Sequence, residues 1–177
     1  MKKKVAIVVA VVDALVKTKN VKIREGGIAI DFRLPDQEGK IHQLSDYKGR
    51  WILLYFYPRD NTPGCTKEAL NIKNHFADFQ KLNILVFGIS VDSIESHKKF
   101  AEKYNIPFSL LSDSKKEIVK KYGVWQKKKL MGNIYMGVKR TSFLISPDFK
   151  IVKIYYNVKP EIHAKEVLQD LTYFLGQ

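Results

Sequence analysis

The sequence predicts an α/β sandwich in which helices flank a mixed central sheet. Residues 51–57 and 83–91 are apolar runs rich in β-branched and aromatic side chains, with the length and composition of buried strands. Each run is followed by a segment whose apolar residues recur at helical spacing. A strand pair and a last helix then close the chain. Strands joined through helices run parallel and a hairpin runs antiparallel, so a sheet built from both is mixed.

The chain is expected to open with a hairpin and a short helical turn. The hairpin pairs residues 31–34 with the segment before Gly39, and the turn covers residues 45–49. The strand 51–57 then turns through Pro63-Gly64 into a helix that runs from about residue 66 to residue 81. Four apolar residues set the helical spacing of this segment: Ala69, Ile72, Phe76 and Phe79.

The later elements follow from the same patterns. Asp92 and Ser93 end the second buried strand, and either residue could cap the next helix. The closing helix is amphipathic, with an apolar stripe of Val167, Leu168, Leu171 and Leu175. In order, we expect a helix over 94–104, a strand over 107–110, a helix over 114–122, a hairpin of 141–146 with 150–156, and a helix over 161–175.

Cys65 is the only cysteine, and it lies in the first turn of the helix that follows the first buried strand. Unsatisfied N–H groups and the positive end of the helix dipole favour an anion at such a place. For a thiol the anion is the thiolate, which is its nucleophilic form. The position therefore indicates a site for sulfur chemistry. The alternative is that Cys65 is a small buried hydrophobe, as lone cysteines often are.

The string YFYPRDNTPGCTKEA around Cys65 resembles the active-site signature of peroxiredoxins, and in particular of their bacterioferritin-comigratory (PrxQ-type) branch. Residues 111–113, 122–125 and 137–145 fall where that branch has similar strings, so the resemblance covers about residues 21–176. It implies a thioredoxin-like fold. It also implies a thiol peroxidase that reduces hydrogen peroxide and organic hydroperoxides without a metal, haem or flavin cofactor.

The resemblance implies roles for four residues. Cys65 is the peroxidatic nucleophile, which attacks ROOH to give a sulfenic acid and ROH. Arg140 matches the family arginine that faces the thiolate, Thr62 matches the hydroxyl that exchanges hydrogen bonds with the peroxide, and Pro58 shields the pocket and fixes the turn. The alternative is that Arg140 is a surface cation among many lysines, but an arginine amid so much lysine favours a specific role. Arg59 is assigned no role.

Leu70 stands five residues after Cys65, where the branch often has a resolving cysteine. We therefore expect a one-cysteine mechanism, in which an external thiol (thioredoxin, glutaredoxin or glutathione) reduces the sulfenic acid. A thioredoxin-like electron carrier or disulfide isomerase would need Cys-x-x-Cys, which a single cysteine cannot supply. A non-enzymatic peroxide sensor or chaperone is the alternative function. We expect a monomer or weak homodimer.

Lys and Arg outnumber Asp and Glu by 31 to 18, which gives a net charge of +13. No nucleic-acid-binding signature accompanies this charge, so it favours solubility or an acidic partner over nucleic acid. The four histidines are widely spaced (His42, His75, His97 and His163), and we expect no metal site. The basic residues form short groups that we place mostly on solvated helix faces: Lys98-Lys99, Lys115-Lys116, Lys120-Lys121 and Lys127 to Lys129.

Residues 1–20 form an apolar extension ahead of a single peroxiredoxin-like domain over 21–177. Lys2 to Lys4 and the apolar residues 5–12 look like the charged and apolar regions of a secretory signal, with cleavage after Ala14. The apolar run is short for a signal and too short to span a bilayer, which needs about 20 residues. We expect export or membrane tethering through residues 1–14, with an added element on a cytoplasmic enzyme as the alternative.

Overall fold

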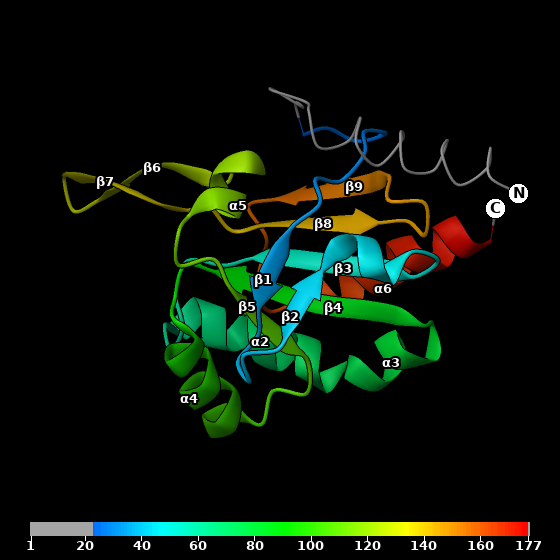
Figure 1. Ribbon diagram of the computed structural model, residues 1–177, viewed down its shortest axis with the longest axis horizontal. Helices are drawn as coiled ribbons and strands as arrows, with labels where there is room; N and C mark the ends of the chain where they lie inside the picture. Colours follow the sequence, from blue (N-terminus) through cyan, green and yellow to red (C-terminus); the bar gives the residue numbers. More distant parts are fainter. Residues whose placement is uncertain (1–22, 177) are drawn as a thin grey trace, which may run out of the picture.

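The computed structural model describes residues 23–176, and its centre is a five-stranded sheet (Figure 1). The strand order is β5-β4-β3-β8-β9. β3 is parallel to β4 and β4 to β5, whereas β8 is antiparallel to both β3 and β9. The predicted mixed sheet is therefore confirmed. The bounds are β3 Trp51–Phe56, β4 Ile84–Ser90, β5 Ser109–Ser112, β8 Thr141–Ile145 and β9 Ile151–Tyr156.

Both faces of the sheet are covered, which makes the sandwich. Side chains alternate along a strand, so β3 directs Leu53 and Tyr55 into one core cluster and Ile52, Leu54 and Phe56 into the other. The first cluster packs under α2 Pro63–Asn74, α3 Phe76–Lys81, α4 Ile94–Tyr104 and α6 His163–Leu175. The second lies under the hairpin of β1 Arg33–Pro35 and β2 Ile41–Gln43, with η1 Leu44–Tyr47 and α5 Glu117–Lys121.

Several predicted elements have the predicted bounds or lie close to them. The helix over 94–104 is α4, and Ser93, one of the two expected caps, accepts a hydrogen bond from the Ser96 N–H at 3.2 Å. The hairpin over 141–156 is formed by β8 and β9. In the opening hairpin, however, the second strand follows Gly39 instead of preceding it, because Asp36 accepts hydrogen bonds from backbone N–H groups in the turn that joins the strands.

The predicted single helix over 66–81 is wrong at His75, where the chain breaks into α2 and α3. His75 leaves the helical conformation (φ −104°, ψ 9°), ending one helix and starting the next. Ile72 of α2 and Phe79 of α3 nevertheless pack in the same core cluster. The short strand and the helix after α4 are also displaced from their predicted bounds. The helix α5 begins only at Glu117, because the Asp113 carboxylate accepts hydrogen bonds from three backbone N–H groups of its first turn.

A two-stranded ribbon, β6 Trp125–Leu130 with β7 Asn133–Val138, was not predicted. It projects from the body of the molecule beside α5 (Figure 1). Lys127 to Lys129 lie on β6, so this basic group is on a strand and not on a helix. Met131 and Gly132 join the strands with positive φ at both positions (49° and 85°), the conformation of a tight hairpin turn.

The expectations for residues 1–14 and 1–20 fall outside the described part of the chain. Within residues 23–176, no helix combines the length and apolarity needed to cross a bilayer. Export or tethering through the N-terminal segment therefore stays a prediction.

Candidate active site

Cys65 occupies the third position of α2, directly behind the end of β3. Thr62 is the N-cap and Pro63 the first helical residue, where proline is well suited because its missing N–H has no partner there. The Thr66 N–H donates to the Thr62 carbonyl at 2.9 Å, which closes the first turn around Cys65. The thiol is 2% exposed. The predicted position in the first turn is confirmed.

Arg140 meets Cys65 from the neighbouring strand. Its Nη2 donates to Cys65 Sγ at 3.3 Å, and its side chain is only 16% exposed, so Arg140 is not a surface cation. It directly precedes β8, whose first residue pairs with Phe56 at the end of β3. Gly64 permits the approach, because a Cβ there would lie 3.1 Å from the Arg140 Nη2.

Glu68 completes the site, although the sequence analysis gave it no role. Three residues after Cys65, it lies on the same side of α2, and its Oε2 accepts from Arg140 Nη1. Burial raises the pKa of Glu68 to about 7, although the Arg140 guanidinium opposes the rise. Burial lowers the pKa of Arg140, but Glu68 and Cys65 outweigh it and the pKa is raised overall. The helical spacing from Cys65 was the signal that could have identified Glu68.

Thr62 and Pro58 lie at the two ends of the loop that joins β3 to α2. The Thr62 hydroxyl donates to the Arg59 carbonyl at 3.0 Å, inside the loop, and does not cap α2. Pro58 is half-buried and Arg59 is exposed. Of the four residues singled out in the sequence, the structure therefore brings Cys65 and Arg140 into contact, and places the other two on the loop that leads to them.

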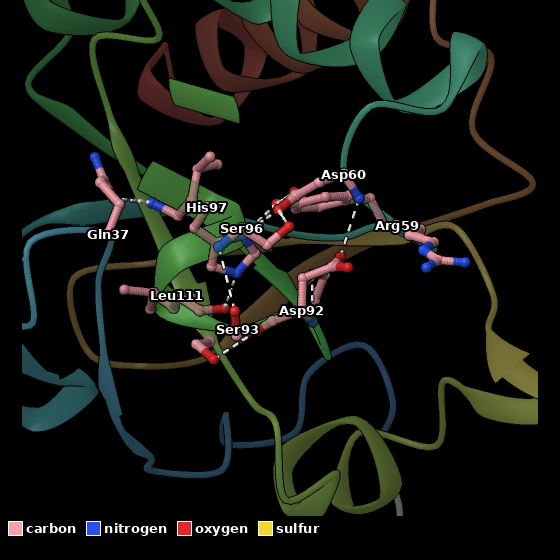
Figure 2. A network of polar contacts seen from close by, with 12 residues as sticks. Gln37, Arg59, Asp60, Asp92, Ser93, Ser96, His97 and Leu111 are labelled. Carbon is pink, nitrogen blue, oxygen red and sulfur yellow. Dashed lines mark hydrogen bonds and ion pairs between the residues drawn. The ribbon is translucent and has the colours of Figure 1, made fainter. Parts of the chain in front are cut away.

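That loop is anchored by a buried polar network around Asp60 (Figure 2). The Asp60 carboxylate accepts from the Tyr57 hydroxyl at 2.7 Å and the Ser96 hydroxyl at 2.7 Å, and it lies 2.9 Å from His97 Nδ1. The Asp60 N–H donates to Asp92 Oδ2 at 3.0 Å. The loop is thus tied to α4 and to the end of β4.

His97 has a hydrogen-bond acceptor beside each ring nitrogen. Nδ1 faces the Asp60 carboxylate, and Nε2 lies 3.2 Å from the Leu111 carbonyl, which can only accept. Through its two ring nitrogens, His97 therefore joins the Asp60 loop to β5. The two side chains are 0% and 2% exposed. The wide spacing of the histidines in the sequence did not indicate that His97 anchors this loop.

Two further basic side chains border the site. Lys128 of the ribbon donates from Nζ to the Val138 carbonyl at 3.3 Å, and burial, followed by repulsion from Arg140, lowers its pKa. His163 lies buried behind β8 with Nε2 2.8 Å from the Ser142 hydroxyl, and burial, with Arg140 nearby, lowers its pKa to about 4. Over residues 23–176, the structure contains no group of three His, Cys, Asp or Glu side chains arranged to hold a metal ion.

Comparison with known proteins agrees with this geometry. Residues 26–154 match the AhpC/TSA family. Peroxiredoxin Bcp of Bacillus subtilis is 43% identical over 149 residues, which are 84% of this chain and 95% of that protein. Peroxiredoxin Bcp of Escherichia coli K12 is 40% identical over 146 residues, 82% of this chain and 94% of that protein.

Solved structures of the same branch superpose on the chain. A cysteine-to-serine mutant of PrxQ from Xylella fastidiosa has a TM-score of 0.82 at 34% identity, over 88% of this chain and 99% of that one. The bacterioferritin comigratory protein of Xanthomonas campestris, studied for its alkyl peroxide reduction, has a TM-score of 0.77 at 33% identity, over 81% and 91%. With Cys65 and Arg140 paired at the start of α2, these matches show that the chain belongs to the AhpC/TSA family and, within it, to the Bcp/PrxQ branch of peroxiredoxins, which are thiol peroxidases.

Proposed function

We propose that this peroxiredoxin works by a one-cysteine mechanism on hydrogen peroxide and alkyl hydroperoxides. The observation that carries the proposal is the 3.3 Å contact between Arg140 Nη2 and the Sγ of the chain's only cysteine, in the first turn of a helix. A guanidinium and a helix N-terminus both favour a thiolate. Reduction of alkyl peroxide by the Xanthomonas relative supports the substrate class.

In the first half-reaction the Cys65 thiolate attacks one oxygen of ROOH. The S–O bond forms as the O–O bond breaks, and the departing RO⁻ takes a proton to leave as ROH, with Cys65 as the sulfenic acid. Arg140 and the N–H groups of Gly64 and Cys65 are donors aimed at the charge that develops. Glu68 acts as a positioning residue, because it holds the guanidinium that contacts the thiol.

Thr62 and Pro58 are proposed to shape the approach of the peroxide. The Thr62 hydroxyl already donates to the Arg59 carbonyl, so its oxygen is left to accept a hydrogen bond from the incoming ROOH. Pro58, half-buried at the start of the loop, limits the access of water. The Asp60 network keeps both residues in place.

The second half-reaction needs thiols from outside the chain. One thiol attacks the sulfenic sulfur, forming a mixed disulfide and releasing water, and a second thiol restores Cys65 and leaves as part of a disulfide. Thioredoxin, glutaredoxin and glutathione are the proposed donors, and the enzyme is proposed to act as a monomer or weak homodimer.

The test is peroxide consumption with excess dithiothreitol, repeated with each proposed donor and with Cys65→Ser as the inactive control. Sustained turnover supports the mechanism, whereas consumption of one equivalent supports the sensor alternative. Arg140→Lys should lower the second-order rate with peroxide at least tenfold (~1.4 kcal/mol), because an ammonium cannot reproduce the guanidinium's two-sided contact. The matched change Arg59→Lys, at the exposed arginine of the loop between β3 and α2, should leave the rate unchanged. If Arg140→Lys reacted with peroxide as fast as Arg59→Lys, Arg140 would have no role in the reaction.

A further inference from the structure

The β6–β7 ribbon projects from the body of the protein (Figure 1), and several of its side chains are large, apolar and exposed. Met131 at its turn is 95% exposed and Ile134 is 71% exposed. The ribbon includes five of the large apolar side chains that are exposed: Leu130, Met131, Ile134, Tyr135 and Met136. By register, Ile134 and Met136 share one face of the ribbon, and Leu130 and Tyr135 share the other. Large exposed apolar side chains gathered on one element mark an interaction site.

All the charged residues in and around the ribbon are basic. Between Glu117 and Asp148 the sequence has no acidic residue, while it has seven cations: Lys120, Lys121, Lys127, Lys128, Lys129, Lys139 and Arg140. Lys128 and Arg140 are engaged at the active site. The charge around the ribbon is therefore complementary to an anionic surface.

The pairing register of the ribbon places exposed lysines and exposed apolar side chains on the same face. Lys127 pairs with Met136 and Lys129 with Ile134 across the ribbon, and residues directly opposite each other in an antiparallel pair share a face. Lys128 pairs with Tyr135 on the other face, where its side chain lies against Gly137. Lys127 and Lys129 are thus exposed lysines beside apolar side chains, on the face opposite Lys128.

We propose that the β6–β7 ribbon docks on an anionic lipid bilayer. Met131, at the turn, and Ile134 enter the boundary between headgroups and acyl chains, while Lys127 and Lys129 extend to the anionic headgroups. Lipid fits this surface better than nucleic acid does, because the phosphate backbone of a duplex would leave the apolar turn in water. Only a surface that is charged outside and apolar beneath satisfies both halves of the ribbon.

The test is co-sedimentation of the full-length chain with vesicles of phosphatidylcholine, with and without phosphatidylglycerol. The full chain is needed as the common background, since its N-terminal segment has lysines and apolar residues of its own. Lys127→Gln/Lys129→Gln removes two charges from the ribbon. Lys99→Gln/Lys103→Gln removes two from exposed positions of α4 and is the matched control. Met131→Ser/Ile134→Ser removes the apolar contact.

We expect binding to anionic vesicles that weakens about tenfold or more in the ribbon-lysine variant, since each lysine near an anionic surface contributes about a factor of five. The apolar variant should weaken similarly, and the α4 control should bind like wild type. Hydrogen peroxide turnover should be unchanged in all three. Three outcomes would each overturn the proposal: the wild type does not bind vesicles, the α4 control loses as much binding as the ribbon variants, or both ribbon variants bind like wild type. The last outcome would assign vesicle binding to other parts of the chain.

Discussion

Replacing Glu68 by Gln should flatten the dependence of stability on pH. Burial raises the pKa of Glu68 to about 7, well above its usual 4.5, so the folded state holds a proton that the unfolded state has released. Stability from this group is therefore complete below about pH 4.5 and is lost as the pH rises through 7. A rise from 4.5 to about 7 corresponds to ~3 kcal/mol, lost by pH 8. Glutamine has no proton to release and should not show this loss.

The assay is urea denaturation of both proteins between pH 4.5 and pH 8, in a Cys65→Ser background so that the thiol does not titrate. His163 also titrates in this range, but it is present in both proteins and cancels in the difference. The free energy of unfolding of the glutamate protein should fall relative to that of the glutamine protein by ~3 kcal/mol across the range. Parallel curves would show that Arg140 keeps Glu68 ionised throughout, and would refute the argument from burial.

Three further changes test other parts of the site. Leu70→Cys should give an intrachain disulfide with Cys65 after one equivalent of peroxide, which mass spectrometry would detect as a loss of two hydrogens. Residues five apart in α2 are separated by about 7.5 Å of rise, so the helix must unwind for this disulfide to form. Sulfenic and sulfinic products alone would show that it cannot unwind. His97→Leu should lower the free energy of unfolding by about 1–3 kcal/mol, because Asp60 and the Leu111 carbonyl each lose a buried hydrogen-bond partner; wild-type stability in urea denaturation would contradict the anchoring role. The pKa of His163 is lowered to about 4, so this residue destabilises the folded state by up to ~3 kcal/mol from pH 6.5 to pH 4, opposite in sign to Glu68; the free energy of unfolding of the wild type should fall by that amount relative to that of His163→Gln.

The nucleophile could be predicted from sequence because its signals are local. The buried strand, the Pro63-Gly64 turn and Cys65 follow one another within fifteen residues, and each is a backbone effect that neighbours in sequence determine. Arg140 is 75 residues from Cys65, and only the resemblance to a family placed it there. Composition alone favoured a specific role for an arginine among so many lysines, but it did not indicate where Arg140 would lie.

The Asp60 network could not be predicted in this way, because its members come from separate segments. Asp60 and His97 are 37 residues apart and belong to no recognisable spacing. They meet because β3 and β4 are parallel neighbours, so the segments that follow their carboxyl ends emerge at the same edge of the sheet. The ribbon was missed for a different reason: both of its faces are largely exposed, so β6 shows none of the apolar alternation that identifies a half-buried strand.

The mixed character of the sheet is what assembles the site. If the neighbouring strand ran parallel to β3, its last residue would lie at the edge of the sheet where α2 begins. Its first residue would lie at the opposite edge. β8 is antiparallel, so its start pairs with the end of β3, and the residue just before it, Arg140, arrives beside Cys65. The ribbon directly precedes Arg140 in the chain and therefore projects from the same edge. The positions of Arg140 and of the ribbon therefore depend on one choice of strand direction.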